Sequence, residues 1–304
     1  MGVPSQGSQV KLYVEPGAAP HTFDTSSERY AVISCTVKKT GSYLDNNEMR
    51  GTRSHAKERI RAGTYTVAGD LVMDLSPADL DLWLPRIMGA AESMDSFAFG
   101  ESLASFAFGL LVVRDFKTHE YTDCKVTKAV CESSEGGHGF LRWTLSIIGK
   151  TEATGTSEPS VALPTDAHDA PYTHYDCAAA VTLDGTARDT KSLRITIDNH
   201  CEAYFNNSQT ADEIKETDRT VMFEWTGPYT ADEFGLYDHA AAGITGAVVY
   251  TNGGMSTTFT FANLKAPAVS PDVSGKGEIP LSLSFIAYKS GSTECLVITS
   301  DSVA

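Results

Sequence analysis

The chain has 304 residues, a length at which about two domains of ordinary size are expected. Its formal net charge of −15 argues against a surface that binds nucleic acid through the phosphates, and against one that binds anionic membranes. No apolar run is long enough for a spanning helix, the six cysteines form no CxxC pair and no signal peptide is recognisable, so we expect free thiols and synthesis in a cytoplasm.

Residues 1–29 are rich in glycine, proline, serine and threonine, and only residues 11–15 (KLYVE) have the character of a strand. This composition predicts an N-terminal arm that lies outside the core. Two interpretations of the arm remain open: a frayed terminus, or a strand that docks on a neighbouring subunit.

A first domain is predicted over residues 30–150. It begins with a core strand at residues 30–39, which a long polar connection over residues 40–60 follows. In the next strand, residues 64–75, apolar side chains keep to odd positions, which indicates one buried face. Gly69 interrupts this strand and predicts a bulge or a close approach of another backbone.

A helix is predicted directly after this strand. Ser76 has the character of an N-cap, and Pro77 occupies the first helical position, where its missing N–H costs nothing. Gly89 predicts the end of the helix. The residues that recur at three- and four-residue spacing form its apolar face: Leu80, Trp83, Leu84 and Ile87.

The residues after the helix contain SFAFG twice, at 96–100 and 105–109. Alternation of phenylalanine with small residues predicts a hairpin that turns near residues 100–102, either as core or as cover for a subunit contact. Strands over residues 109–132 and a closing strand over residues 140–150 complete the first domain.

The second part of the chain repeats the first in order and spacing. Residues 151–178 are predicted to be a linker, and residues 179–304 a second domain. Thr230 repeats the helix cap of the first domain, and Gly243 falls 154 positions after Gly89. We interpret this as internal duplication. The second copy departs from the first because Phe223 replaces the strand glycine and the hairpin insert is missing.

Equivalent loops of the two copies differ in the sign of their charge. The first loop is basic, with Arg50, Arg53, Lys57, Arg59 and Arg61, whereas the second is acidic, with Glu202, Asp212, Glu213, Glu216 and Asp218. Solvated loops alone would account for such residues. Our hypothesis is that the loops meet between molecules, so that charge reversal at Arg53 and Arg59 would weaken assembly more at low salt than at high salt.

Catalytic chemistry has little support in the sequence. His168, Asp169, His174, Asp176 and Cys177 crowd the end of the linker, but their spacing matches no standard metal site. Neither a phosphate-binding loop nor a G-x-S-x-G elbow occurs. We therefore expect no catalytic residues, no metal and no cofactor.

The run from Arg61 to Leu80 reads R-x-G-x-x-x-V-x-G-x-L-x-x-x-x-S-P-x-D-L. This run, with the order of elements around it, resembles the tail tube proteins of long-tailed, non-contractile bacteriophages over residues 30–150 and, more weakly, over residues 190–290. The resemblance implies a mainly β fold with one helix per domain. It further implies two tandem domains of β-sandwich or half-barrel type, related by internal duplication.

The resemblance also implies a function. The chain would be a structural virion protein and not an enzyme, and would assemble in the cytoplasm of the bacterial host into stacked rings that form a tail tube for genomic DNA. Single-domain members form hexameric rings, so a duplicated chain implies a trimeric ring with pseudo-sixfold symmetry. The implied partners are further copies of the chain, a tape-measure protein, DNA passing through the lumen, and the tail terminator and distal tail proteins, with no membrane. An acidic lumen would repel DNA phosphates and agrees with the net charge.

Two other functions remain as alternatives. Another virion component of the same fold, such as a tail terminator, baseplate hub or decoration protein, would share these motifs. A β-sandwich carbohydrate-binding module or enzyme would need an exposed aromatic platform or paired carboxylates. Trp83, Trp143 and Trp225 occupy apolar periodic positions that are typical of a core instead.

Overall fold

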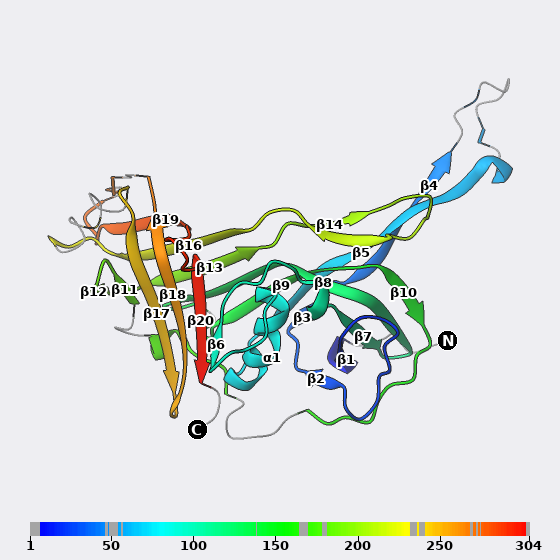
Figure 1. Cartoon of the computed structure of the whole chain (residues 1–304), viewed down its shortest axis with the longest axis horizontal. Helices are drawn as coiled ribbons and strands as arrows, with labels where there is room; N and C mark the ends of the chain where they lie inside the picture. Colours follow the sequence, from blue (N-terminus) through cyan, green and yellow to red (C-terminus); the bar gives the residue numbers. More distant parts are fainter. Residues whose placement is uncertain are drawn as a thin grey trace.

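The computed structural model describes residues 7–45, 48, 54–55, 57–137, 139–163, 170–177, 181–231, 236, 241–267, 270–271, 273 and 275–301. This part of the chain is mainly β, as predicted, with one regular helix, α1 (Pro77–Met88) (Figure 1). The second helix predicted after Thr230 falls mostly outside these residues.

Residues up to 154 form the first half of the molecule, and residues from 170 onward form the second half. The first half contains β1 (Val10–Pro16), β2 (Glu28–Tyr30), β3 (Ser34–Cys35), β4 (Lys38–Asp45), β5 (Ile60–Met73), β6 (Ser96–Phe97), β7 (Phe108–Arg114), β8 (Lys117–Ser134), β9 (Arg142–Gly149) and β10 (Thr151–Thr154). The second half contains β11 (Val181–Leu183), β12 (Thr186–Ala187), β13 (Ser192–Asp198), β14 (Cys201–Tyr204), β15 (Glu213–Glu216), β16 (Thr220–Pro228), β17 (Ile244–Asn252), β18 (Met255–Lys265), β19 (Pro280–Ala287) and β20 (Leu296–Asp301).

Strands pair in the same order in the two halves. In the first half the order is β4–β5–β9–β8–β7–β1–β2, with β10 on the free side of β8. In the second half it is β13–β16–β19–β18–β17–β11–β12, with β20 on the free side of β18. The halves are joined because β8 also pairs with β13.

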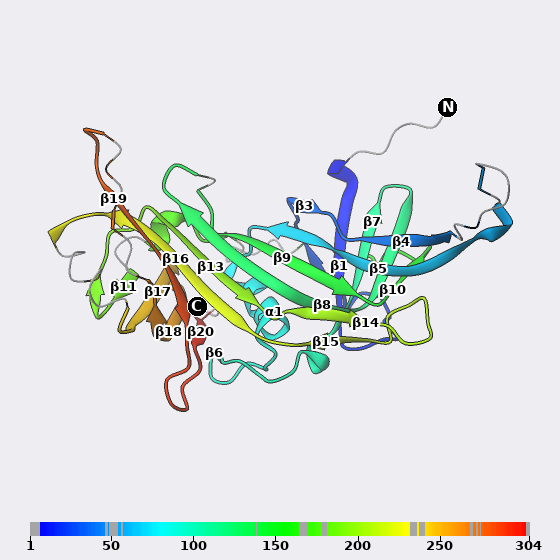
Figure 2. The ribbon, with the colours of Figure 1, turned by 90° about the horizontal axis from the view of Figure 1, so that it is seen from above.

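Strand β8 belongs to two layers of the first half. A register shift between Val126 and Lys128 bends it, so that its first part pairs with β7 and β10 and its last part with β9 and β13. The main sheet therefore runs without interruption through β4, β5, β9, the end of β8, β13, β16 and β19, and Figure 2 shows these strands side by side.

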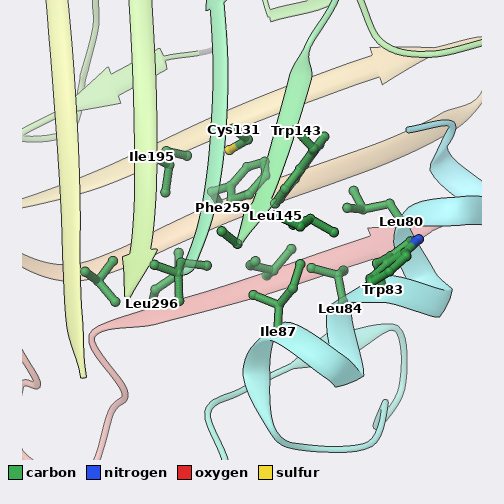
Figure 3. Close-up of a cluster of buried hydrophobic side chains, with 14 of the residues drawn as sticks. Leu80, Trp83, Leu84, Ile87, Cys131, Trp143, Leu145, Ile195, Phe259 and Leu296 are labelled. Atoms are coloured by element: carbon green, nitrogen blue, oxygen red, sulfur yellow. The ribbon is translucent and has the colours of Figure 1, made fainter. Parts of the chain in front are cut away.

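One hydrophobic core spans both halves, and α1 lies against it (Figure 3). Trp143 of β9 stacks on Phe259 of β18, with ring centroids 6.3 Å apart, and Trp83 of α1 is fully buried. The helix boundaries follow the prediction, because the Ser76 hydroxyl accepts a hydrogen bond from the Asp79 N–H at 3.1 Å and Gly89 takes a left-handed conformation with φ +72°.

Gly69 lies where β5 meets the junction of β3 and β4. A Cβ atom there would lie 2.5 Å from the backbone of Thr36 and 2.5 Å from the Cα of Val37, so the predicted close approach of another backbone is confirmed. The absence of a side chain lets the neighbouring strand pass directly over this residue.

We predict that Gly69→Ala destabilises the protein by about 1–3 kcal/mol, the usual cost of forcing extra volume into packed structure. Urea unfolding followed by circular dichroism would measure the change. Thr66→Ala, at an exposed position of the same strand, is the control and should change the free energy of unfolding by less than about 0.5 kcal/mol. Equal stability of the two variants would contradict the steric explanation.

Two segments that were predicted to lie outside the domains are part of the core. Leu12, Tyr13 and Val14 of β1 are all buried, because one face of the strand packs on the main core and the other lies in a small cluster against which Phe23 and Val161 pack. Apolar and polar residues do not alternate along Leu12 to Val14, because both faces of the strand are covered. The predicted linker likewise contributes β10 and the buried residue Tyr172.

The hairpin predicted from the repeated SFAFG motif does not form. Instead Phe97 of β6 pairs with Ile298 of β20, and residues 104–106 form a short 3-10 turn. The pairing with the C-terminal strand fills the space beside α1 with Phe97 and Phe108, which are fully buried. The aromatic residues therefore serve the core, which was one of the two expectations.

Candidate assembly surfaces

The main sheet ends in an open edge at β4. All eight residues of this strand are exposed, and within the described chain it pairs with β5 alone. The Thr36 N–H donates to the Asp70 carbonyl at 2.9 Å, so the backbone groups of Thr36, and of alternate residues after it, point toward β5. Those of Val37 and Lys39 point away. The Val37 carbonyl accepts hydrogen bonds from the Arg114 guanidinium and the Tyr121 hydroxyl. The backbone groups of Lys39 are therefore the first along β4 that point to the open edge.

The opposite end of the main sheet is also open. Strand β19 pairs with β16 along its length, but among the described residues only Ile286 and Ala287 pair with β18. The outer backbone groups between Leu281 and Phe285 therefore have no described partner. A single sheet thus presents a strand edge at each of its ends.

The seam between β8 and β13 joins the two halves. Seven residue pairs form an antiparallel ladder, from Ser192 opposite Ser134 to Asp198 opposite Lys128, and the Asn199 N–H extends it by donating to the Thr127 carbonyl at 2.7 Å. Across this seam Lys128 lies 3.8 Å from Asp198.

The predicted basic loop over residues 40–60 includes the end of β4, up to Asp45, and the start of β5 at Ile60, and this pair of strands projects from the body of the molecule (Figure 1). Arg50 and Arg53 lie outside the described residues. Lys57, Arg59 and Arg61 are exposed; Arg59 lies 3.4 Å from Glu48, and Lys57 3.9 Å from Glu58. The same hairpin exposes apolar side chains that the charge pattern of the sequence does not indicate: Tyr43 (78% exposed), Leu44 (63%) and Ile60 (39%).

The predicted acidic loop is the β14–β15 hairpin and its flanks, and most of its carboxylates are held locally. Glu202 is exposed, Glu213 lies 3.5 Å from Lys215, and Asp212 and Asp218 accept hydrogen bonds from the backbone of Asn206 and Arg219. Among the described residues, no ion pair joins this loop to the basic one. A meeting of the two loops between molecules stays a prediction.

Gln209, at the tip of the acidic loop, contacts the first half of the chain. Its side-chain amide donates to the Ala62 carbonyl at 2.8 Å, and its backbone carbonyl accepts from the Tyr65 N–H at 3.1 Å. The sequence does not indicate a role for this residue, because a neutral side chain in a polar loop gives no sign that it makes a contact. The β14–β15 hairpin is therefore tied to β5.

Glu216 is the one predicted acidic residue with a buried partner. Its carboxylate accepts from Lys125 Nζ and from the Leu103 N–H, at 2.8 and 2.9 Å, and the Lys125 side chain is only 9% exposed. Burial raises the pKa of the carboxyl, but the hydrogen bonds and charge of Lys125 outweigh it, so the pKa is lowered. The pair ties the second-half hairpin to β8.

We expect Glu216→Gln to lower the free energy of unfolding by about 1–3 kcal/mol at pH 7, because Lys125 loses a charged partner. A carboxyl with a lowered pKa stabilises the folded state above its unfolded pKa, near 4.3, and this contribution is lost as pH falls further. The difference from the wild type should therefore shrink below about pH 4. Urea titrations between pH 3 and 7 would measure it. Glu213→Gln, at an exposed ion pair, should show almost no difference at any pH.

The solvent-facing side of the main sheet is polar, with nearly balanced charge. Arg194 lies 3.8 Å from both Glu132 and Glu224, and Arg142 lies 3.0 Å from Asp74. Serine and threonine fill much of the space between these pairs. A hollow of about 500 Å³ on this side is lined by Glu132, Ser134, Arg194, Glu224, Thr226, Ser282 and Ser284, among others. Because Arg194 is shared by two glutamates and the Asp70 carboxylate accepts from the Ser146 hydroxyl, the charges of the described residues on this face nearly balance, with a small acidic excess.

The cluster considered as a metal site has structural contacts. His174 is buried; its Nδ1 lies 2.9 Å from the Ser133 hydroxyl and its Nε2 lies 3.1 Å from the Thr190 carbonyl. Asp176 accepts from the Thr173 N–H at 2.6 Å. His168 and Asp169 lie outside the described residues. Across the described ranges no group of three or more His, Cys, Asp or Glu side chains could hold a metal ion, and no helix there is long and apolar enough to cross a membrane.

Comparison with known proteins identifies the family. A family model described as phage tail tube protein matches residues 7–287. A search of the curated proteins found no match. The family match runs through both halves and includes β1, the R-x-G-x-x-x-V-x-G motif of β5 and strands β11 to β19 of the second half. The chain therefore belongs to the phage tail tube protein family, whose members are structural components of the virion.

Proposed function

We propose that this protein assembles into closed rings that stack into a phage tail tube, through which the genomic DNA passes. The observation that carries the proposal is the main sheet, which ends in open edges at β4 and β19. An exposed strand edge favours pairing with another chain, and ring closure removes every such edge. Head-to-tail pairing of identical chains gives a closed ring when the rotation per subunit closes.

We further infer that the two halves arose by internal duplication, which sets the symmetry of the ring. The support is the shared pairing order together with matching registers: Ala68 pairs with Ile148 in the first half, and Met222 pairs with Ile286 at the same place in the second. On this basis β13 is the counterpart of β4, and the β8–β13 seam is the intrachain example of the antiparallel pairing that β4 would make with the next protomer. Three protomers would then give a trimeric ring with pseudo-sixfold symmetry.

The polar side of the main sheet would line the lumen, because the other side packs on the core. Paired charges and small hydroxyl side chains offer DNA phosphates no cluster of free cations, so the DNA would pass without strong binding. The proposed partners are further copies of the chain, the tape-measure protein, transiently the genomic DNA, and the tail terminator and distal tail proteins. The proposed location is the virion tail, after assembly in the host cytoplasm.

Negative-stain electron microscopy of the purified protein, across a range of concentrations and salt levels, would test the proposal. We expect rings with a central hole, three protomers per ring by mass, and stacking into tubes. Single rings that never stack would indicate a terminator or hub. Monomers under every condition, including in the presence of a tail initiator complex, would contradict assembly into a tube.

A further inference from the structure

An apolar contact holds the second-half hairpin β14–β15 on the first half of the chain. Cys201 and Ile214 of this hairpin are 8% and 1% exposed, and they form a small cluster with Leu103 against which Ile148 packs. Ile148 lies near the end of β9, where it pairs with Lys125 of β8. The second-half hairpin thus docks on the last residues of the first-half β9.

The first-half hairpin β4–β5 has the same registers, but within the described part of the chain it makes no such contact. Cys201 pairs with Glu216, and Ala203 with Ile214; in the first half Tyr43 pairs with Ala62, and Asp45 with Ile60. Tyr43 and Ile60 therefore occupy the places of Cys201 and Ile214. Unlike those two residues they are 78% and 39% exposed.

The surface that would receive this hairpin is also uncovered, at the far end of the main sheet. Ile148 pairs with Ala68 and Lys125 in the first half, and Ile286 pairs with Met222 and Lys265 in the second. Ile286 is thus the counterpart of Ile148. It is 40% exposed, and Tyr288 beside it is 46% exposed. Hairpin and receiving surface lie at opposite ends of one sheet, so a single chain cannot join them as it joins their counterparts.

We infer that the β4–β5 hairpin of one protomer docks laterally on the end of β19 of its neighbour, with Tyr43 and Ile60 packed against Ile286. The inference rests on the proposed ring and duplication, and it names the contact that would stabilise each junction. The occupant is a second copy of this chain, because the intrachain counterpart is already filled in the same register. Ala62 takes the place of Glu216, so the contact lacks the ion pair made to Lys125 and should depend little on salt.

Disulfide trapping would test the contact directly. In Tyr43→Cys/Ile286→Cys, mild oxidation of assembled protein should link neighbouring protomers, and the largest product on a non-reducing gel should be the closed ring. Leu44→Cys/Ile286→Cys is the matched control, because Leu44 is exposed on the same strand but alternates to the other face. In the single variant Ile148→Cys the new thiol would lie beside the native Cys201. Oxidation should therefore form the equivalent link within the monomer.

Assembly measurements give a second readout. Ile286→Asp should raise the protein concentration needed for ring formation by on the order of tenfold or more, since burial of such a side chain is lost. Ser284→Asp, exposed on the same face of β19, should have little effect. The salt concentration should have little effect on the protein concentration at which either variant forms rings.

The outcomes separate this inference from the proposed function. Wild-type rings that form without the Tyr43→Cys/Ile286→Cys link, and with an unaffected Ile286→Asp variant, would overturn the lateral contact and leave the ring intact. Linked products longer than one ring would place the hairpin contact between stacked rings and also overturn the inference. Absence of wild-type rings under every condition would overturn both.

Discussion

Replacement of Lys39 by proline should abolish ring formation and leave the monomer folded. The backbone N–H of Lys39 points to the open side of β4, since the Thr36 N–H points to β5 and the direction alternates along the strand. In the second half the counterpart of Lys39 is Ile197 of β13, which pairs with Ala129 of β8. Proline has no N–H to donate, so Lys39→Pro removes a bond of the junction without removing a bond between β4 and β5.

Thr40→Pro is the matched control for this prediction. The N–H of Thr40 points toward β5, so its loss should destabilise the monomer itself, with a lower midpoint of thermal unfolding. Lys39→Ala separates the backbone from the side chain, whose Nζ lies 3.9 Å from the ring centroid of Tyr65. Thermal unfolding would measure the stability of each variant, and sedimentation would measure its assembly into rings. Normal rings of Lys39→Pro would show that the edge of β4 takes no part in assembly.

The local parts of the fold could be predicted because local chemistry determines them. The cap at Ser76, the end at Gly89 and the close approach at Gly69 each depend on a few adjacent residues. The strand character of β1 was predicted, but its place in the core was not, because a strand covered on both faces lacks the alternation of apolar and polar residues that indicates burial.

The pairing between distant strands could not be read in the same way. The repeated SFAFG motif is compatible with a hairpin, but β6 pairs instead with β20, about two hundred positions further along the chain. Residues next to β6 in the sequence do not indicate such a distant partner. The charged loops were recognised as unusual, but the contacts that anchor the acidic one come from Gln209 and from the buried Lys125. Of the hairpin residues that make these contacts, the sequence indicated only Glu216, because the neutral Gln209 and the apolar Cys201 and Ile214 form no recognisable pattern.

We expect Trp143→Ala to cost about 3–5 kcal/mol, the usual loss for removal of a large buried aromatic side chain. Trp143 is 1% exposed and stacks on Phe259, so the cavity would lie between β9 of the first half and β18 of the second. The β8–β13 seam and the single core join the same two halves. The loss of stability should therefore extend to both halves and not remain confined to the first half.

Hydrogen exchange of the backbone amides would measure this spread. In Trp143→Ala, protection should fall in β17 and β18 of the second half as well as in β5 and β9 of the first. Phe116→Ala, at a side chain that is 72% exposed in the turn between β7 and β8, should leave both halves unchanged. Loss of protection confined to the first half would mean that the two halves unfold independently despite their shared core. In the proposed ring each chain would then contain two units that unfold separately, whereas coupled unfolding would make each protomer a single unit.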